Sequence, residues 1–384
     1  MTAAAGPSRW PTSGPTSRPA LGPVPVVARG VCHLCFATDI GFSVDLERAA
    51  SLLPGSADRA QFRERRTPSH LTIEPAPLRV VERAAPIEVG AWRTLPHVEL
   101  TLFDFGGAAI RYRIPLEGPL DRFAHLSELL YENRTLLVAA QRQIESLLER
   151  VRPAVSRPDH ARLIEDYAIF QVEAFEAPIE PARLLGEHAA LLASILRAER
   201  GPLSAQEIAE ATSQTSSYRP DDLLVVDWNA AFAVDDDFEA ITALLEFANV
   251  ELVELRMVDG QLDGLVDRAY EVVAARSLRD TLGIGPSRHE IHRLARVQMD
   301  SAIVFEQVNN ALKLLGDEYL ARVHRLAARR LHTGDWDASI ERKLQTVDQI
   351  YTKVTDRQAN RRMELLEWII ILLILWEVVW AFVR

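Results

Sequence analysis

Several short stretches of this sequence carry side chains that could do chemistry, and the first is a pair of cysteines. Cys32 and Cys35 form a Cys-x-x-Cys pair with His33 between them. A zinc site would need further ligands at matching spacing, and none stands out. A thioredoxin-like pair would stand at a helix N-terminus, whereas this pair lies in a strand pattern that points its side chains to opposite faces. We expect two buried structural cysteines.

The second stretch resembles a zinc-protease motif. That motif needs two histidines four residues apart, but His289 and His292 are three apart and position 293 is Arg. The sequence therefore predicts no zinc site there. Asp104-Phe105-Gly106 likewise copies a protein-kinase tripeptide without the glycine loop or catalytic loop of a kinase, and it fits a hairpin turn instead.

The third stretch is rich in acids. Six aspartates lie close together in the sequence: Asp221, Asp222, Asp227, Asp235, Asp236 and Asp237. The last three precede an expected helix, where acids complement the helix dipole and cap free N–H groups. A metal-dependent nuclease or hydrolase would use such oxygens as ligands, which makes the Asp221–Asp237 acids the basis of an enzymatic alternative.

Hydrophobic periodicity predicts a mixed α/β body over residues 24–258 that positions these stretches. The expected strands are Val24–Ala37, Leu78–Val89, His97–Phe103, Ala108–Ile114, Glu165–Phe175, Leu223–Val234 and Val250–Val258. The expected helices are Asp45–Leu53, Pro119–Val151, Pro181–Arg200, a short one capped by Ser204, and Phe238–Ala248. The Pro-, Ser- and Thr-rich residues 1–23 predict a disordered tail.

Residues 259–360 predict a helical domain. A helix at Leu262–Leu282 is followed by a long helix from Ser287 to about Leu331 and a turn at residues 332–335. The next helix carries a narrow coiled-coil-like seam: Ile340, Leu344, Val347, Tyr351 and Val354. Two long helices joined by a tight turn predict an antiparallel hairpin.

The terminal residues 361–384 predict a membrane helix. Leu365 to Val383 is apolar except for Glu367 and Glu377, and about 20 apolar residues suffice to span a bilayer. Trp368 and Trp380 fit interface anchors. The residues expected to serve the membrane helix and self-association are Arg362, Leu366, Glu367, Trp368, Glu377 and Trp380. An acid near the bilayer centre needs a proton or a partner, which suggests self-association.

The end of the chain also resembles a known family. Its helices carry Leu315-Gly316-Asp317-Glu318-Tyr319-Leu320, then Leu366-Glu367-Trp368-Ile369-Ile370, then Glu377. This order is similar to the domain-of-unknown-function family named after the protein required for meiotic nuclear division. The resemblance implies a mixed α/β body, a helical hairpin ending in a membrane segment, and homo-oligomers. It implies no cofactor and no catalytic residue. Eukaryotic relatives in that family are linked to mitochondrial membranes. The Pro-rich opening of this chain does not fit a signal or transit peptide, so we carry over the anchor and not a mitochondrial role.

Composition agrees with a folded protein of this kind. The chain has 384 residues, 48% of them hydrophobic, and a formal net charge of −11, which argues against general nucleic-acid binding. Its two cysteines provide no disulfide framework. We therefore expect an α+β fold with a C-terminal transmembrane helix, the bulk being cytoplasmic. The predicted function is a non-enzymatic, tail-anchored, oligomeric scaffold or binding module without cofactor or metal, whose partners are membrane lipid and its own copies.

Overall fold

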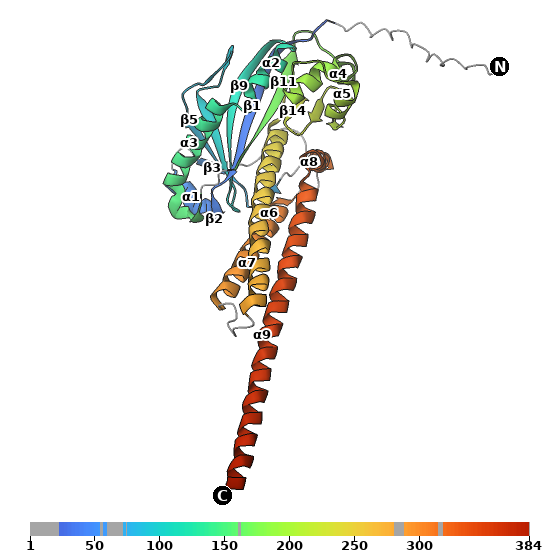
Figure 1. Ribbon diagram of the computed structural model, residues 1–384. Coiled ribbons are helices and arrows are strands. Elements are labelled where there is room, and N and C mark those ends of the chain that lie inside the picture. Colours follow the sequence, from blue (N-terminus) through green and yellow to red (C-terminus); the bar gives the residue numbers. More distant parts are fainter. Residues whose placement is uncertain are drawn as a thin grey trace, which may run out of the picture.

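A nine-stranded sheet forms the body of the computed structural model, which describes residues 23–53, 57–59, 72–73, 75–159, 163–279, 288–313 and 318–383 (Figure 1). The strand order is β12-β13-β14-β11-β1-β9-β8-β5-β3. The central strand, β1 (Val26–Asp39), pairs antiparallel with β9 (Gly107–Pro119) and with β11 (Ile164–Phe175). The pairing of β11 with β14 (Ala230–Val234) is parallel. The mixed α/β body is thus present.

The other strands are short, and their bounds complete the fold. The remaining members of the large sheet are β3 (Ala57–Arg59), β5 (Leu78–Arg83), β8 (His97–Leu102), β12 (Thr215–Ser216) and β13 (Leu223–Val226). Small antiparallel pairs join β2 (Gly41–Val44) to β10 (Val155–Pro158), β4 (Thr72–Ile73) to β15 (Leu312–Lys313), and β6 (Glu88–Val89) to β7 (Trp92–Arg93). The predicted strand at 223–234 is therefore a hairpin of β13 and β14.

Helices cover both faces of the large sheet. One face carries α1 (Leu46–Leu52), α2 (Arg122–Leu130), α3 (Arg134–Val151) and α4 (Pro181–Arg197); the other carries α6 (Glu239–Arg279) and α8 (Glu318–Leu331) (Figure 1). Cys32 packs in the first layer and Cys35 in the second. Both are free and buried, and burial raises the pKa of both thiols. The prediction of buried cysteines on opposite faces is confirmed.

Two local predictions are also confirmed. The turn between β8 and β9 requires glycine, because Gly106 has a φ of +103° and a Cβ there would lie 1.8 Å from the carbonyl oxygen of Gly41. The Oγ of Ser204 accepts a hydrogen bond from the N–H of Glu207 at 3.1 Å and caps α5 (Ala205–Ala211).

A buried ionic network joins the sheet to α6. Arg111 of β9 is 2% exposed and forms an ion pair with Glu99 of β8, the residue directly opposite it in the ladder. Its Nη1 lies 3.6 Å from Oε2 of Glu246 on α6, and the hydroxyl of Thr101 donates to the other oxygen of Glu246 at 2.6 Å. Burial raises the pKa of Glu99, but attraction to Arg111 and Arg113 outweighs it and lowers that pKa.

The C-terminal helices differ from the prediction. Residues 250–258 form no strand, because α6 runs unbroken through them and through the predicted domain boundary at 258–259. The predicted long helix at 287–331 is divided into α7 (Arg288–Ala311) and α8 by β15. The seam of α9 (Thr333–Val383) packs on α6, where Ile340 and Val347 share one apolar cluster with Leu255 and Val258.

These helices form a three-helix bundle and not the predicted antiparallel pair. Lys343 of α9 pairs with Asp259 at 2.7 Å and with Asp263 at 2.5 Å. The two helices α6 and α9 run side by side in the same direction, and α7 lies against them (Figure 1). The predicted tail at residues 1–23 lies outside the described residues except for its last residue.

The predicted C-terminal transmembrane helix is wrong. Over the ranges that the structure describes, no helix has both the length and the apolar character that a membrane crossing needs. The predicted membrane localisation and the predicted tail anchor depended on this helix, and they are therefore wrong as well.

We predict that Arg111→Met lowers the free energy of unfolding by about 3–5 kcal/mol, because it leaves the carboxylate of Glu246 buried without a cation and leaves Glu99 with Arg113 alone. Urea unfolding followed by circular dichroism measures the change. Arg93→Met, which removes an exposed arginine of β7, is the control and should change the free energy by less than about 0.5 kcal/mol. Equal effects of the two substitutions would contradict the role given to Arg111.

Candidate functional site

The acids on which the enzymatic alternative depends serve the fold and do not converge on one point. The carboxylate of Asp222 accepts hydrogen bonds from the N–H groups of Tyr218 and Arg219, both at 2.8 Å, and closes the turn before β13. Oδ1 of Asp235 accepts from the N–H of Asp237 at 2.9 Å, just before α6. Within the described ranges, no group of three or more His, Cys, Asp and Glu side chains could hold a metal ion.

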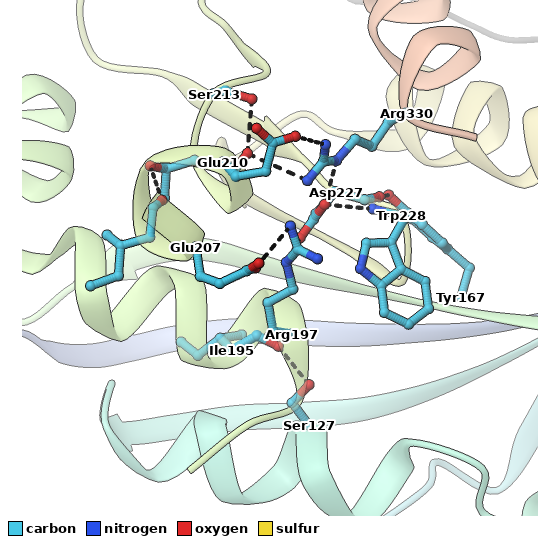
Figure 2. Close-up of polar contacts among 12 residues, drawn as sticks. Ser127, Tyr167, Ile195, Arg197, Glu207, Glu210, Ser213, Asp227, Trp228 and Arg330 are labelled. Atoms are coloured by element: carbon cyan, nitrogen blue, oxygen red, sulfur yellow. Dashed lines mark hydrogen bonds and ion pairs between the residues drawn. The ribbon is translucent and has the colours of Figure 1, made fainter. Parts of the chain in front are cut away.

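Asp227 is the most deeply buried member of this group, and Figure 2 shows two arginines reaching it from different helices. Its side chain is fully buried at the turn between β13 and β14. Nε of Arg197, at the end of α4, lies 2.7 Å from Oδ2, and Nε of Arg330 on α8 donates to Oδ1. Burial raises the pKa of Asp227, although both arginines act to lower it.

Neighbouring groups extend this cluster to α5 and to the sheet. Arg330 also donates from Nη1 to Oε1 of Glu210 at 2.7 Å, and the hydroxyl of Tyr167 donates to the backbone oxygen of Asp227 at 2.9 Å (Figure 2). The cluster therefore fastens α4, α5 and α8 to one end of the sheet. Its charges are paired with one another, which fits a structural joint better than a catalytic centre.

A second candidate site is an exposed stretch of α9. We call it the terminal apolar segment and define it as the described residues Leu366–Trp376 and Trp380. Figure 1 shows this end of α9 extending beyond α6 and α7. Each large hydrophobic side chain of the segment is more than half exposed, from 51% for Ile369 to 68% for Trp376. The rings of Trp376 and Trp380 stack with their centroids 6.2 Å apart.

The residues predicted for self-association lie on this helix. Leu366, Glu367, Trp368 and Trp380 are exposed members of α9, on a stretch that the bundle does not cover. The side chains of Arg362 and Glu377 lie outside the described residues, as do those of His289 and His292. The expected need of Glu377 for a partner therefore stays a prediction.

Sequence comparison finds relatives of the α/β body. The family model described as "Uncharacterized protein MJ0711, N-terminal domain" matches residues 29–240, which is more than half of the chain. The chain belongs to this family. It is also similar to a protein of Methanocaldococcus jannaschii, "Uncharacterized protein MJ0711", with 22% identity over 242 residues that cover 62% of this chain and 73% of that protein. No solved structure matches.

The matched region ends where the helical part begins. Residues 29–240 include most of β1, the acids up to Asp237 and the first residues of α6, and they exclude the terminal apolar segment. The family descriptions name no activity, ligand or partner. The function must therefore be argued from the geometry of this chain.

Sequence reasoning missed the ionic network and the Asp227 cluster. A signal for the first was available, because the hairpin turn at residues 104–107 sets a register in which Glu99 lies opposite Arg111. No comparable signal exists for the second. Arg197, Asp227 and Arg330 are brought together only when α4 and α8 pack at the same end of the sheet.

We predict that Asp227→Ala lowers the free energy of unfolding by about 3–5 kcal/mol, since it leaves two largely buried arginines without their shared carboxylate. Asp221→Ala, at an exposed aspartate of the same group, is the matched control and should change it by less than about 0.5 kcal/mol. Thermal unfolding with and without MgCl2 provides the second readout. A stabilisation by Mg²⁺ that either substitution removes would favour the metal-site alternative over the structural joint.

Proposed function

We propose that this chain is a non-enzymatic binding module that assembles with copies of itself through the terminal apolar segment of α9. The single observation that carries the proposal is the exposure of this segment. Its apolar side chains face solvent on every side of the helix, whereas exposed apolar surface on a soluble protein is normally scattered. A helix that is apolar all round is stable in water only when other helices cover it.

The other described residues of the same chain do not supply that cover. Higher on α9 the seam residues Ile340, Leu344 and Val347 already pack against α6. Below this contact α9 extends away from the bundle (Figure 1). The segment is therefore available to a second molecule, and another copy presents the same surface with the same length and polarity.

The heptad spacing of α9 supports pairing between copies. Counting on from Ile340, Leu344 and Val347 in steps of four and three passes two polar positions, Gln358 and Arg361, and then reaches Trp368, Leu372 and Leu375. Large apolar residues at a and d positions are the signature of helices that associate along a seam. The upper part of the pattern is used within the chain, and we propose that the lower part is used between chains.

The family resemblance noted for the C-terminal helices agrees with this proposal. The family named after the protein required for meiotic nuclear division is expected to form homo-oligomers, and the residues that carry the resemblance include Leu366–Ile370 of the segment. We propose this relation for the helical part of the chain, which lies beyond residues 29–240. It adds an oligomer to the proposed function but no activity.

The enzymatic alternative has less support. A nuclease or hydrolase that used the Asp221–Asp237 acids would need several carboxylates aimed at one point. Asp222 and Asp235 instead hold backbone N–H groups, and Asp227 is held by two arginines. A scaffold or binding role therefore remains the proposal that the geometry favours.

We predict that the full chain forms an assembly of defined mass, at least twice that of a single chain, and that Leu372→Glu with Leu375→Glu converts it to the monomer. The two carboxylates cannot be buried in an apolar seam without a large desolvation cost. Size-exclusion chromatography with light scattering measures the mass. The paired substitution should leave thermal unfolding of the α/β body unchanged.

The matched control is Gln345→Glu with Gln349→Glu, which adds the same charge to exposed positions of α9 beside the bundle and should leave the assembly intact. A monomeric unsubstituted chain would contradict the proposal. A mass that grows with concentration without reaching a plateau would also contradict it, since that is undirected aggregation.

A further inference from the structure

A cavity of about 330 Å³ lies beside the ends of β1 and β2, between them and the helices α6 and α7. This volume falls at the lower end of the range of small-molecule sites in proteins. Its apolar wall is formed by Phe42, Met257, Val258, Val297 and Val304. The cavity is separate from the terminal apolar segment and from the Asp227 cluster.

Two carboxyl groups of the cavity lining lie next to each other. Asp39 ends β1 and is 8% exposed, and Glu254 of α6 is 1% exposed. The two side chains lie within hydrogen-bonding reach of each other. Oε1 of Glu254 is completely buried and accepts no hydrogen bond from any N–H or O–H group of the described residues. A buried carboxyl oxygen in this state calls for a proton or a cation.

The charged neighbours that the structure describes do not neutralise the pair. The N–H of Gly41 donates to Asp39, while Asp159 adds negative charge beside it. Arg157 is bound by both carboxylate oxygens of Asp300, at 2.5 and 3.2 Å, and lies 3.7 Å from the centre of the Phe42 ring. These contacts bind the Arg157 guanidinium to Asp300 and to the Phe42 ring.

The other cation of the lining stands at the opposite end. Arg268 follows Glu254 on α6 by fourteen residues, which at the helical rise places their backbones about 21 Å apart. That distance exceeds the reach of an arginine side chain. Among the described lining residues, the end of the cavity at Asp39 and Glu254 is therefore acidic.

We propose that this cavity binds a primary alkylammonium ion, with the ammonium group between Asp39 and Glu254 and the alkyl chain along the apolar wall. An ammonium group has three N–H donors and no acceptor, which suits two carboxyl groups with an unused oxygen. A metal ion fits less well, because no third His, Cys, Asp or Glu of the described residues completes a set of ligands with them. The wall of valine, methionine and phenylalanine favours an organic cation.

The carboxyl pair makes this binding dependent on pH. Burial, with the charge of Asp159 adding to it, raises the pKa of Asp39 to about 7, and burial also raises the pKa of Glu254. Below pH 7 a proton occupies the place that the ammonium group would take. Affinity should therefore rise with pH, by about tenfold between pH 6 and pH 8 for one displaced proton.

The test is isothermal titration calorimetry of the full chain with n-butylammonium chloride at pH 6 and pH 8. We expect binding that is about tenfold tighter at pH 8 and that releases a proton to the buffer at pH 6. Glu254→Gln and Asp39→Asn, each nearly equal in shape to the original residue, should each weaken binding at least tenfold. Asp263→Asn, which changes an exposed acid of the same helix, should leave it unchanged.

Four results would overturn the proposal. The first is that n-butylammonium fails to bind. The second is that n-butanol binds as tightly as n-butylammonium, which would show that the cavity recognises the alkyl chain and not the ammonium group. The third is that MgCl2 alone produces the heat while n-butylammonium does not, which would assign the pair to a metal. The fourth is that both substitutions fold with unchanged circular dichroism and leave binding unaltered.

Discussion

The fold depends on a buried arginine held between two carboxylates. Arg111 is covered on one side by the sheet and on the other by α6, and its charge is balanced by Glu99 and Glu246. Such a group tolerates few arrangements, because a shift of α6 along the sheet would separate buried charges from their partners. The ionic network therefore sets where α6 crosses the strands. The apolar layers on either side supply burial but would permit more than one position.

The position of α6 in turn fixes both sites. Two turns beyond Glu246 the same helix carries Glu254 to the end of β1, and further on it carries Asp259 to Lys343 of α9. Sheet, cavity and bundle are thus connected through one continuous helix. Because α9 is aligned on α6, its terminal apolar segment is directed away from the body (Figure 1). The proposed association surface and the proposed cation cavity share no residue.

The sequence predicted elements whose signal is local. The strands at 97–103 and 108–114, the glycine turn between them and the cap at Ser204 follow from alternation, backbone freedom and capping chemistry. The prediction from sequence was wrong along α6, where residues 250–258 were expected to form a strand. The sheet and the bundle both cover this part of the helix, so its apolar residues lie on several sides. The helical period is therefore hidden in the sequence. Asp39 and Glu254 are far apart in the chain, and only tertiary packing brings them together. The terminal helix was predicted to span a membrane from its apolar length, and this was wrong.

Cysteine crosslinking along the terminal apolar segment tests the proposed assembly most directly. Single cysteines are placed at successive positions from Ile369 to Leu375, while the native cysteines stay buried and unreactive. Mild oxidation joins only residues whose Cα atoms lie within about 7 Å. The account predicts covalent dimers, strongest at Leu372 and Leu375 and weaker between them. An absence of crosslinks throughout the segment, at concentrations where light scattering detects the assembly, would contradict it.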